Sequence, residues 1–441
     1  MKSFKQHIAC FLTTASLLSL LTGCGEHEEF AGGETRARFC IGVKGRGETM
    51  DPVADNEKIC SWWIAMVGND DNVVKSIIRR DEALTQGVEE ETFQTSLPAG
   101  RYRAYAFANI TEAELEEHTR GGGEKGVVFE YGRPLAADVD NAVWNGLANN
   151  YPKTNLVPMC GRRDVTVTGH VREPFAVEVV RMLAKMEFEF SSEASTPIKV
   201  KNVSISPVAT GSLPLLPDYD ALDKGAAPVF PEPEATEIVK YSINEDNGHM
   251  FAANAEGKHS EWFYLRESSA AAHPSGHFIV SVGLERDGKE EEALYAPASE
   301  LSYVYRNDWV RIPIVLTDWV LELDVTFYPP IGGYPAVKTE EKDNEFYARF
   351  GTGGYFAIVP RVRNGGGGGY LPAEKLKVTL TVINDPSGIF DRVPEYDKAE
   401  GAVSGHMSVA TGTAEIGLSV EVLNEASAKR IYERTVYIIR E

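Results

Sequence analysis

The stretch Val177–Phe190 (VEVVRMLAKMEFEF) constrains the fold of this chain more than any other. Apolar side chains recur at every second position on either side of a small break at 182–184. A period of two, with β-branched and aromatic residues on one face, is typical of a half-buried β-strand. Two cations, Arg181 and Lys185, stand inside this otherwise regular pattern. The stretch therefore predicts β-structure and marks two charged positions within it.

The same period of two recurs along most of the chain, whereas helical patterning is confined to short pieces. The capping-box spacing of Thr111 and Glu114 predicts one short helix, and 425–433 is a second candidate. Asp287-Gly288 between two predicted strands indicates a β-hairpin, because type I′ turns need positive φ there. Cys60–Val67 is a continuous apolar run, which suits a central strand buried on both faces. We therefore predict an all-β fold of tandem antiparallel β-sandwich domains, transthyretin- or immunoglobulin-like, with little helix.

The first residues predict an exported lipoprotein. Lys2 and Lys5 precede an apolar run that is shorter than a membrane span and is interrupted by Thr and Ser. The run ends in Leu21-Thr22-Gly23-Cys24, which resembles the lipobox of lipoprotein signal peptidase. We expect 1–23 to be a signal peptide, Cys24 to carry lipid in the outer membrane, and 24–35 to be a tether. The acidic cluster after Cys24 resembles the surface-export signal of Bacteroidetes lipoproteins. Alternatively, these residues are only a solvated tether.

Charge and cysteine content exclude several classes of function. The chain has 441 residues and a formal net charge of −21, which argues against nucleic acid and anionic lipid as partners. This length suggests two or three domains. Beyond Cys24 the cysteines are Cys40, Cys60 and Cys160, without the spacing of a metal site. A disulfide between Cys40 and Cys60 is one alternative to free thiols at these positions. In either case the fold does not depend on a disulfide framework.

The sequence contains no recognisable catalytic motif. It lacks HExxH, GxSxG and the GxxxxGK[ST] phosphate loop. His273 and His277 are four residues apart, but Pro274 and Gly276 preclude the helix that would align them as metal ligands. We therefore expect no enzyme, no metal and no cofactor.

Four short motifs resemble the fimbrillins, the type V pilus subunits that Bacteroidales carry as surface lipoproteins. The first is the Arg181-x-x-Ala-Lys step described above. The others are the Pro-Met-x-Gly segment in Asn155–Gly161, the turn and Gly-x-Tyr strand in Thr92–Ile110, and Arg306-Asn307-Asp308-Trp309. Trp309 stands where the family usually has Tyr. The resemblance covers roughly residues 36–318.

This resemblance implies two β-sandwich domains, at 36–172 and 173–318. A common stalk subunit would nearly end there, so 319–441 is expected to be a C-terminal β extension or a third small sandwich. The implied function is that of a structural or adhesive fimbrial subunit, in a tip, accessory or anchor role at least as readily as in a stalk. The implied partners are other fimbrial subunits and a host or bacterial surface receptor or glycan.

The resemblance also implies assembly by donor-strand exchange. In fimbrillins an Arg-specific protease removes the lipidated N-terminus with its first strand, and another subunit fills the gap. Arg46 is the candidate cleavage site, because it follows the strand predicted at Arg38–Lys44; the alternative is an uncut loop arginine. The candidate donor strand is C-terminal and includes Val436, Tyr437, Ile438 and Ile439. Its alternative is an ordinary last strand of its own domain.

Four aromatic residues in the C-terminal part are candidates for adhesion: Trp319, Tyr328, Tyr334 and Tyr355. A second interpretation of the chain is a surface glycan-binding lipoprotein whose aromatic side chains stack on sugar rings.

Overall fold

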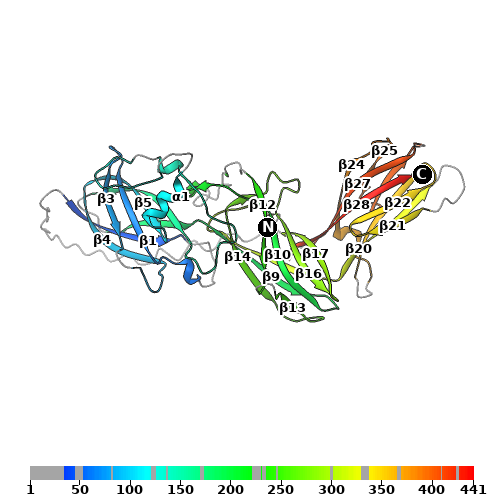
Figure 1. Ribbon diagram of the computed structural model, residues 1–441, viewed down its shortest axis with the longest axis horizontal. Coiled ribbons are helices and arrows are strands. Elements are labelled where there is room, and N and C mark those ends of the chain that lie inside the picture. Colours follow the sequence, from blue (N-terminus) through cyan, green and yellow to red (C-terminus); the bar gives the residue numbers. More distant parts are fainter. Residues whose placement is uncertain are drawn as a thin grey trace, which may run out of the picture.

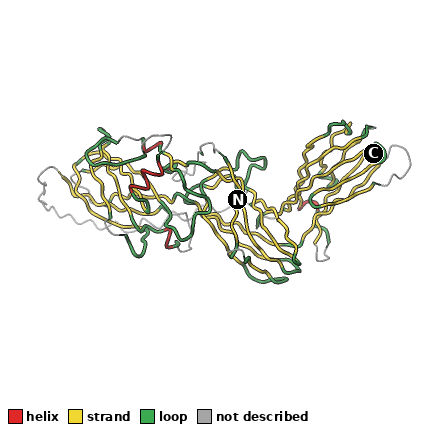
Figure 2. The backbone as a smooth tube through the Cα atoms, in the orientation of Figure 1, coloured by secondary structure: helices red, strands yellow, loops and turns green. Residues whose placement is uncertain are grey.

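The computed structural model describes residues 34–44, 53–80, 83–120, 126–135, 138–168, 173–220, 230, 235–244, 247–297, 301–328, 337–364, 369–408, 410–423 and 427–441. Three β-domains follow one another in a row (Figure 1), and strands make up nearly all of the regular structure (Figure 2). The predicted all-β fold is confirmed. Within the described residues no helix is long and apolar enough to cross a membrane.

The first domain is a seven-stranded sheet that folds over its own core, in the order β3-β2-β5-β7-β8-β1-β4. Alternating apolar residues of β1, β2, β5 and β8 meet in this core, among them Phe39, Ile64 and Val177. The strands are β1 (Glu34–Val43), β2 (Trp62–Gly68), β3 (Val74–Arg79), β4 (Glu90–Pro98), β5 (Gly100–Ala108), β7 (Met159–Val167) and β8 (Phe175–Arg181).

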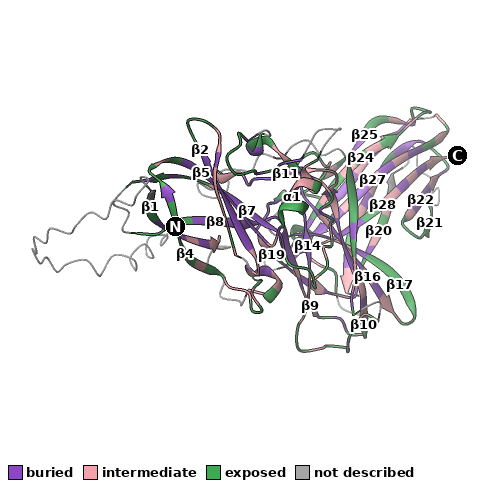
Figure 3. Cartoon of the chain, turned by 60° about the vertical axis from the view of Figure 1, so that its left-hand side comes forward, coloured by how far each residue is buried: buried purple, intermediate pink, exposed green. Residues whose placement is uncertain are grey.

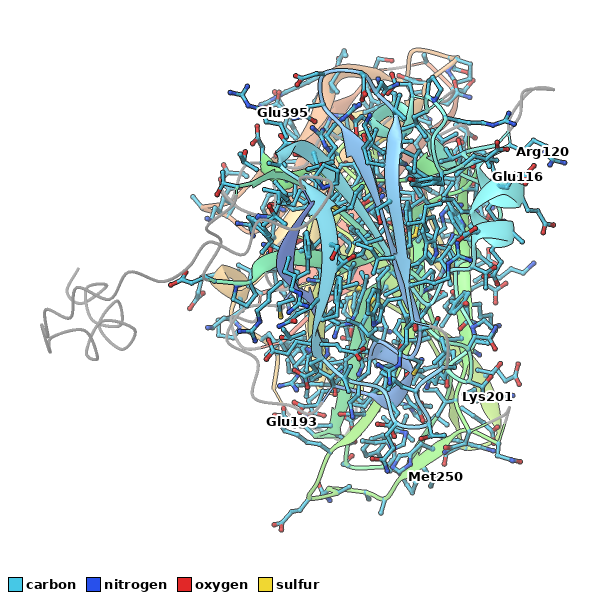
Figure 4. The ribbon with its side chains drawn as sticks, turned by 90° about the vertical axis from the view of Figure 1, so that its left-hand side faces the viewer. Glu116, Arg120, Glu193, Lys201, Met250 and Glu395 are labelled. Atoms are coloured by element: carbon cyan, nitrogen blue, oxygen red, sulfur yellow. The ribbon has the colours of Figure 1, made fainter. Side chains whose placement is uncertain are left out.

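A second apolar cluster covers the outer face of β2 and β5. It includes Leu115 of the helix α1 (Glu112–Thr119) and Trp144 of the short strand β6 (Val143–Trp144). Every residue of β2 is therefore buried, as its continuous apolar run predicts. Thr111 caps α1 with the predicted capping box, while Glu116 and Arg120 form an ion pair at its exposed side (Figure 4).

The second domain packs the sheet β14-β9-β19 against β12-β10-β16-β17 around a core of its own. Asp287 and Gly288 both have positive φ, at 49° and 74°, as the predicted hairpin turn between β16 and β17 requires. The strands are β9 (Ala184–Ser192), β10 (Ile198–Ala209), β12 (Thr236–Ser242), β13 (His249–Phe251), β14 (His259–Leu265), β15 (Ser268–Ser269), β16 (Ile279–Arg286), β17 (Lys289–Ala296), β18 (Tyr303–Val304) and β19 (Trp309–Leu316). Between β10 and β12 in the chain, β11 (Leu213–Pro214) pairs with β6 of the first domain.

The third domain packs β20-β23-β26-β25 against β21-β22-β28-β27-β24 around a third core. β28 begins beside β17 of the second domain and then runs between β22 and β27 of the third, so one strand joins the two domains. The strands are β20 (Trp319–Tyr328), β21 (Lys338–Lys342), β22 (Glu345–Phe350), β23 (Gly354–Asn364), β24 (Leu376–Asn384), β25 (Phe390–Asp397), β26 (Ala402–Met407), β27 (Gly412–Val422) and β28 (Lys429–Arg440).

The structure corrects four details of the sequence-based prediction. β8 pairs with β1 and β7, so the boundary expected at 172/173 comes one strand too early, and the chain enters the second domain at Met182–Leu183. β1 already begins at Glu34, inside the predicted tether. The pairs β1/β8, β9/β19 and β22/β28 are parallel within otherwise antiparallel sheets. Residues 429–433 belong to β28 and not to a helix.

Candidate functional site: the first strand and the domain junction

β1 lies between two neighbours in the first sheet. It pairs antiparallel with β4 from Glu34 to Gly42 and parallel with β8 from Phe39 to Val43. Both edges of β1 are thus hydrogen-bonded over much of its length. If β1 left the sheet, it would expose the facing edges of β4 and β8.

The side chains of β1 fill the core of the first domain. Ala37, Phe39 and Ile41 are fully buried, and Arg36 and Arg38 on the opposite face of the strand are exposed. The Phe39 ring stacks on Phe93 of β4, with centroids 5.6 Å apart, and packs against Phe175 of β8 at 5.3 Å. These contacts make Phe39 the main apolar anchor of β1.

The two cations of the Arg181-x-x-Ala-Lys step are buried where the chain passes from β8 to β9. Figure 3 shows that buried residues are concentrated in the strands of the sheets. Arg181 is 3% and Lys185 is 8% exposed. Their shared partner is Glu57, itself 2% exposed, whose carboxylate lies 3.9 Å from Arg181 Nε and 3.5 Å from Lys185 Nζ. Burying these charges is tolerated because they are paired and hydrogen-bonded.

Hydrogen bonds extend this charged cluster across the boundary between the first two domains. Tyr264 of β14 donates its hydroxyl to Glu57 Oε1 at 2.9 Å, and Arg181 Nε donates to the Glu57 carbonyl at 3.1 Å. Arg181 Nη1 also donates to Asn307 Oδ1 at 2.9 Å. We call Glu57, Arg181, Lys185, Tyr264 and Asn307 the junction network.

The junction network reaches the end of β1. The backbone carbonyl of Lys44 accepts hydrogen bonds from Asn307 Nδ2 at 3.3 Å and from Arg181 Nη1 at 3.5 Å. The Lys44 amide donates to the Val179 carbonyl at 2.9 Å. The last described residue of the N-terminal segment is thus held by groups from both domains.

Lys185 also lies between two tryptophans of the second domain. Its Nζ is 4.5 Å from the ring centroid of Trp262 and 4.8 Å from that of Trp309. Because cations cover the faces of both rings, with Lys153 over Trp262 and Arg311 over Trp309, these indoles are occupied by cation–π contacts. They stiffen the junction and offer no open platform for a ligand.

A second buried ion pair belongs to the same junction. Arg306 is fully buried, and its Nε donates to Glu267 at 2.7 Å while its Nη1 donates to the Leu215 carbonyl at 3.0 Å. The buried Cys160 thiol donates to the same carbonyl at 2.8 Å, and burial raises the pKa of this thiol to about 12. Cys40, Cys60 and Cys160 are all free thiols.

Some of the predicted site residues fall outside the described part of the chain. Cys24, Arg46 and Tyr334 lie there, together with the predicted signal peptide. Lys44, two residues before Arg46, is described, and so is Val53 on the far side of that segment.

The other adhesion candidates do not gather at one place. Trp319 and Tyr328 stand at opposite ends of β20, and Trp319 packs against the core of the third domain. Tyr355 pairs in register with Tyr328 and is 54% exposed, with its ring against His406 at 4.3 Å. Tyr355 is therefore the one of the four whose described side chain is open to solvent.

The predicted donor strand is part of β28 within its own domain. Val436 and Ile438 are buried in the third core, while Tyr437 and Ile439 lie on the half-exposed outer face. All four pair with β22 on one side and β27 on the other. Transfer of this segment to another subunit would require both ladders to break.

Sequence reasoning missed Glu57, Asn307 and Tyr264. Glu57 lies in a short 3-10 helix within a polar stretch and carries no periodic signal. Asn307 adopts φ +67°, a left-handed conformation in which Asn is enriched, and in the sequence it stands out only as part of the Arg306-Asn307-Asp308-Trp309 motif. The one signal in the sequence is the position of Arg181 and Lys185 within an apolar strand pattern, because buried cations need a carboxylate as a partner.

No protein-family model and no curated protein matches this chain. A candidate cell adhesion protein from Parabacteroides distasonis is similar in structure, with 11% identity, 64% of this chain and 88% of that chain covered, and a TM-score of 0.42. A further candidate cell adhesion protein, from Bacteroides eggerthii, has 12% identity, 64% and 86% coverage, and a TM-score of 0.41. The tip fimbrial protein Mfa3 from Porphyromonas gingivalis, with a C-terminal truncation, has 12% identity, 75% and 99% coverage, and a TM-score of 0.38. At these scores the likeness assigns neither a family nor a function to this chain.

Proposed function

We propose that this chain is a non-enzymatic, surface-exposed adhesive or structural subunit of the fimbrillin kind, anchored at first by lipid on Cys24. Cleavage after Arg46 removes the segment that contains β1, and a strand of another subunit takes its place. The cut chain then acts as a tip or accessory subunit, with Tyr355 of the third domain as an exposed adhesive aromatic, whereas an uncut chain that keeps its lipid would be an anchor subunit.

The observation that carries this proposal is the place of β1. It is the first strand of the described chain, it precedes the segment that contains Arg46, and it lies between β4 and β8 with its apolar side chains in the core. Its loss would leave two unpaired edges above an apolar groove, which an incoming strand would satisfy. Head-to-tail contacts of this kind do not close on themselves and generate a filament.

The proposal does not extend to β28 of a neighbouring copy as the strand that enters the groove. β28 is central in its own sheet and contributes buried side chains to the third core. A subunit of another type, with a free extended segment, avoids the cost of dismantling that domain.

An assembly assay tests the proposal. The purified chain is treated with an arginine-specific protease and mixed with the other subunits of its fimbrium, and unheated samples are examined for SDS-resistant ladders. We expect ladders from the wild type and none from Arg46→Ala, while Arg38→Ala in β1 assembles like the wild type. Equal ladders from Arg46→Ala, or no assembly after a verified cut, would contradict the proposal.

A further inference from the structure

Lys44 follows the hydrogen-bond pattern of a parallel strand pair. In a parallel pair a residue donates its N–H to one position of the neighbouring strand and directs its carbonyl toward a position two residues further on, whereas directly opposed antiparallel residues exchange both bonds. The Lys44 amide donates to the Val179 carbonyl of β8, as in a parallel ladder, whereas its own carbonyl accepts from the side chain of Arg181. Here the guanidinium of Arg181, joined by the amide of Asn307, contacts this carbonyl.

These two side chains are fixed from several directions. Arg181 is held by the Glu57 carbonyl and by Asn307 Oδ1, and Glu57 is in turn held by Tyr264. The Asn307 backbone amide donates to the Leu183 carbonyl at 3.0 Å. Both side chains are buried, so their donors to the end of β1 are enclosed between residues of the first and second domains.

We propose that Arg181 and Asn307 form a clamp that binds the C-terminal end of the strand between β4 and β8 through a backbone carbonyl. The clamp retains a strand that presents a backbone carbonyl at the position of Lys44. This inference rests on the proposed function where it concerns an incoming strand. It specifies the partner as an extended peptide of defined minimum length.

The first test uses the uncut, full chain and does not depend on strand replacement. Asn307→Asp keeps the acceptor for Arg181 and suits a left-handed residue, but it removes the donor to the Lys44 carbonyl. Asn254→Asp is the matched control, because Asn254 also has positive φ, 50°, and is exposed.

Residue-resolved hydrogen exchange supplies the readout. Loss of a hydrogen bond of ordinary strength raises exchange of the Lys44 amide by roughly fivefold in Asn307→Asp, with the Phe39 and Ile41 amides unchanged. Asn254→Asp leaves all three as in the wild type. Unchanged Lys44 exchange in Asn307→Asp would overturn the clamp.

The second test addresses the incoming strand. A fluorescent peptide amide with the sequence of residues 34–44 is bound, under reducing conditions, to the chain cut after Arg46. Compared with it are a peptide that ends at Val43 and one with Lys44→Ala, which keeps the carbonyl but loses the ammonium group that pairs with Glu178.

We expect the peptide that ends at Val43 to dissociate from the wild type about fivefold faster than the peptide with residues 34–44. From Asn307→Asp, the ratio of these two dissociation rates should be smaller. The Lys44→Ala peptide should stay close to the full-length one. Equal dissociation of all three peptides from both proteins would overturn the inference. If no peptide binds the cut chain, the proposed strand replacement fails, while the exchange experiment still decides the clamp on β1 itself.

Discussion

Glu57 is the carboxylate that joins the buried cations at the junction of the first two domains. It is the shared carboxylate for Arg181 and Lys185 and the acceptor for Tyr264. Removing one partner of a buried charge cluster leaves the others uncompensated.

We therefore expect Glu57→Gln to lower the free energy of unfolding by about 3 kcal/mol, measured by urea titration. The exposed Glu256→Gln, which makes the same substitution on the surface of the second domain, should change it by less than about 0.5 kcal/mol. Equal effects of the two substitutions would mean that the junction charges contribute little to stability.

The three free thiols should differ in reactivity because their surroundings differ. Cys40 and Cys60 are half-buried, burial raises the pKa of Cys60, and burial raises that of the enclosed Cys160 to about 12. Since the thiolate is the reactive form, alkylation at pH 8 should modify Cys40 first, Cys60 more slowly and Cys160 only on unfolding. Peptide mass mapping over time measures this order, and early labelling of Cys160 in the folded chain would contradict it.

The same burial makes stability depend on pH in the alkaline range. The folded state favours the neutral thiol of Cys160, so the contribution of this group is fully present below its ordinary pKa of 9.0 and is lost as the pH rises toward about 12. We expect Cys160→Ala to flatten the fall of the urea midpoint between pH 9 and pH 11, compared with the wild type. An unchanged slope would assign the alkaline loss to other groups.

At the scale of elements, β1 is attached chiefly through Phe39. Phe39→Ala removes a fully buried ring that stacks on Phe93 and packs against Phe175, and it should cost about 3–5 kcal/mol of stability in the first domain. Arg38→Ala on the exposed face of the same strand should cost less than about 0.5 kcal/mol. Urea unfolding of both variants gives the comparison, and a small loss for Phe39→Ala would mean that β1 is only loosely anchored.

β28 offers a test of whether the C-terminal segment belongs to its own domain. Val436→Asn puts an amide into the third core, whereas Thr435→Asn changes the half-exposed outer face of the same strand. We expect Val436→Asn to make the third domain sensitive to limited proteolysis and Thr435→Asn to leave it resistant. Equal resistance of both would indicate that β28 can leave the sheet at little cost, as a donor strand must.

Elements with a local signal were predicted well from the sequence, and those defined by a distant partner were not. The capping box at Thr111, the Asp287-Gly288 turn and the buried β2 each depend on neighbouring residues, and the structure contains all three. Alternation cannot tell which strand lies alongside, so the place of β8 in the first sheet and the parallel β1/β8 pair were missed. Glu57 was missed for the same reason, since it lies 124 residues before Arg181.

At the scale of the whole molecule, three cores are joined by two different kinds of connection. The first and second domains share the buried charges of the junction network, with Arg306 and Glu267 nearby. The second and third share β28, whose first residues pair with β17 on one edge and with β27 on the other. The contacts of Arg181 and Asn307 with Lys44 place the end of β1 at the first of these connections. Loss of β1 would therefore remove hydrogen bonds made by residues of both the first and the second domain.

The most direct test of this account is the intact mass and N-terminal sequence of the protein on, and shed from, its native cell surface. If β1 is removed for assembly, the shed, polymeric material begins at Gly47 and lacks the lipid. A population made up only of the form acylated at Cys24, in filaments as well as on cells, would show that β1 stays in place and would contradict strand replacement.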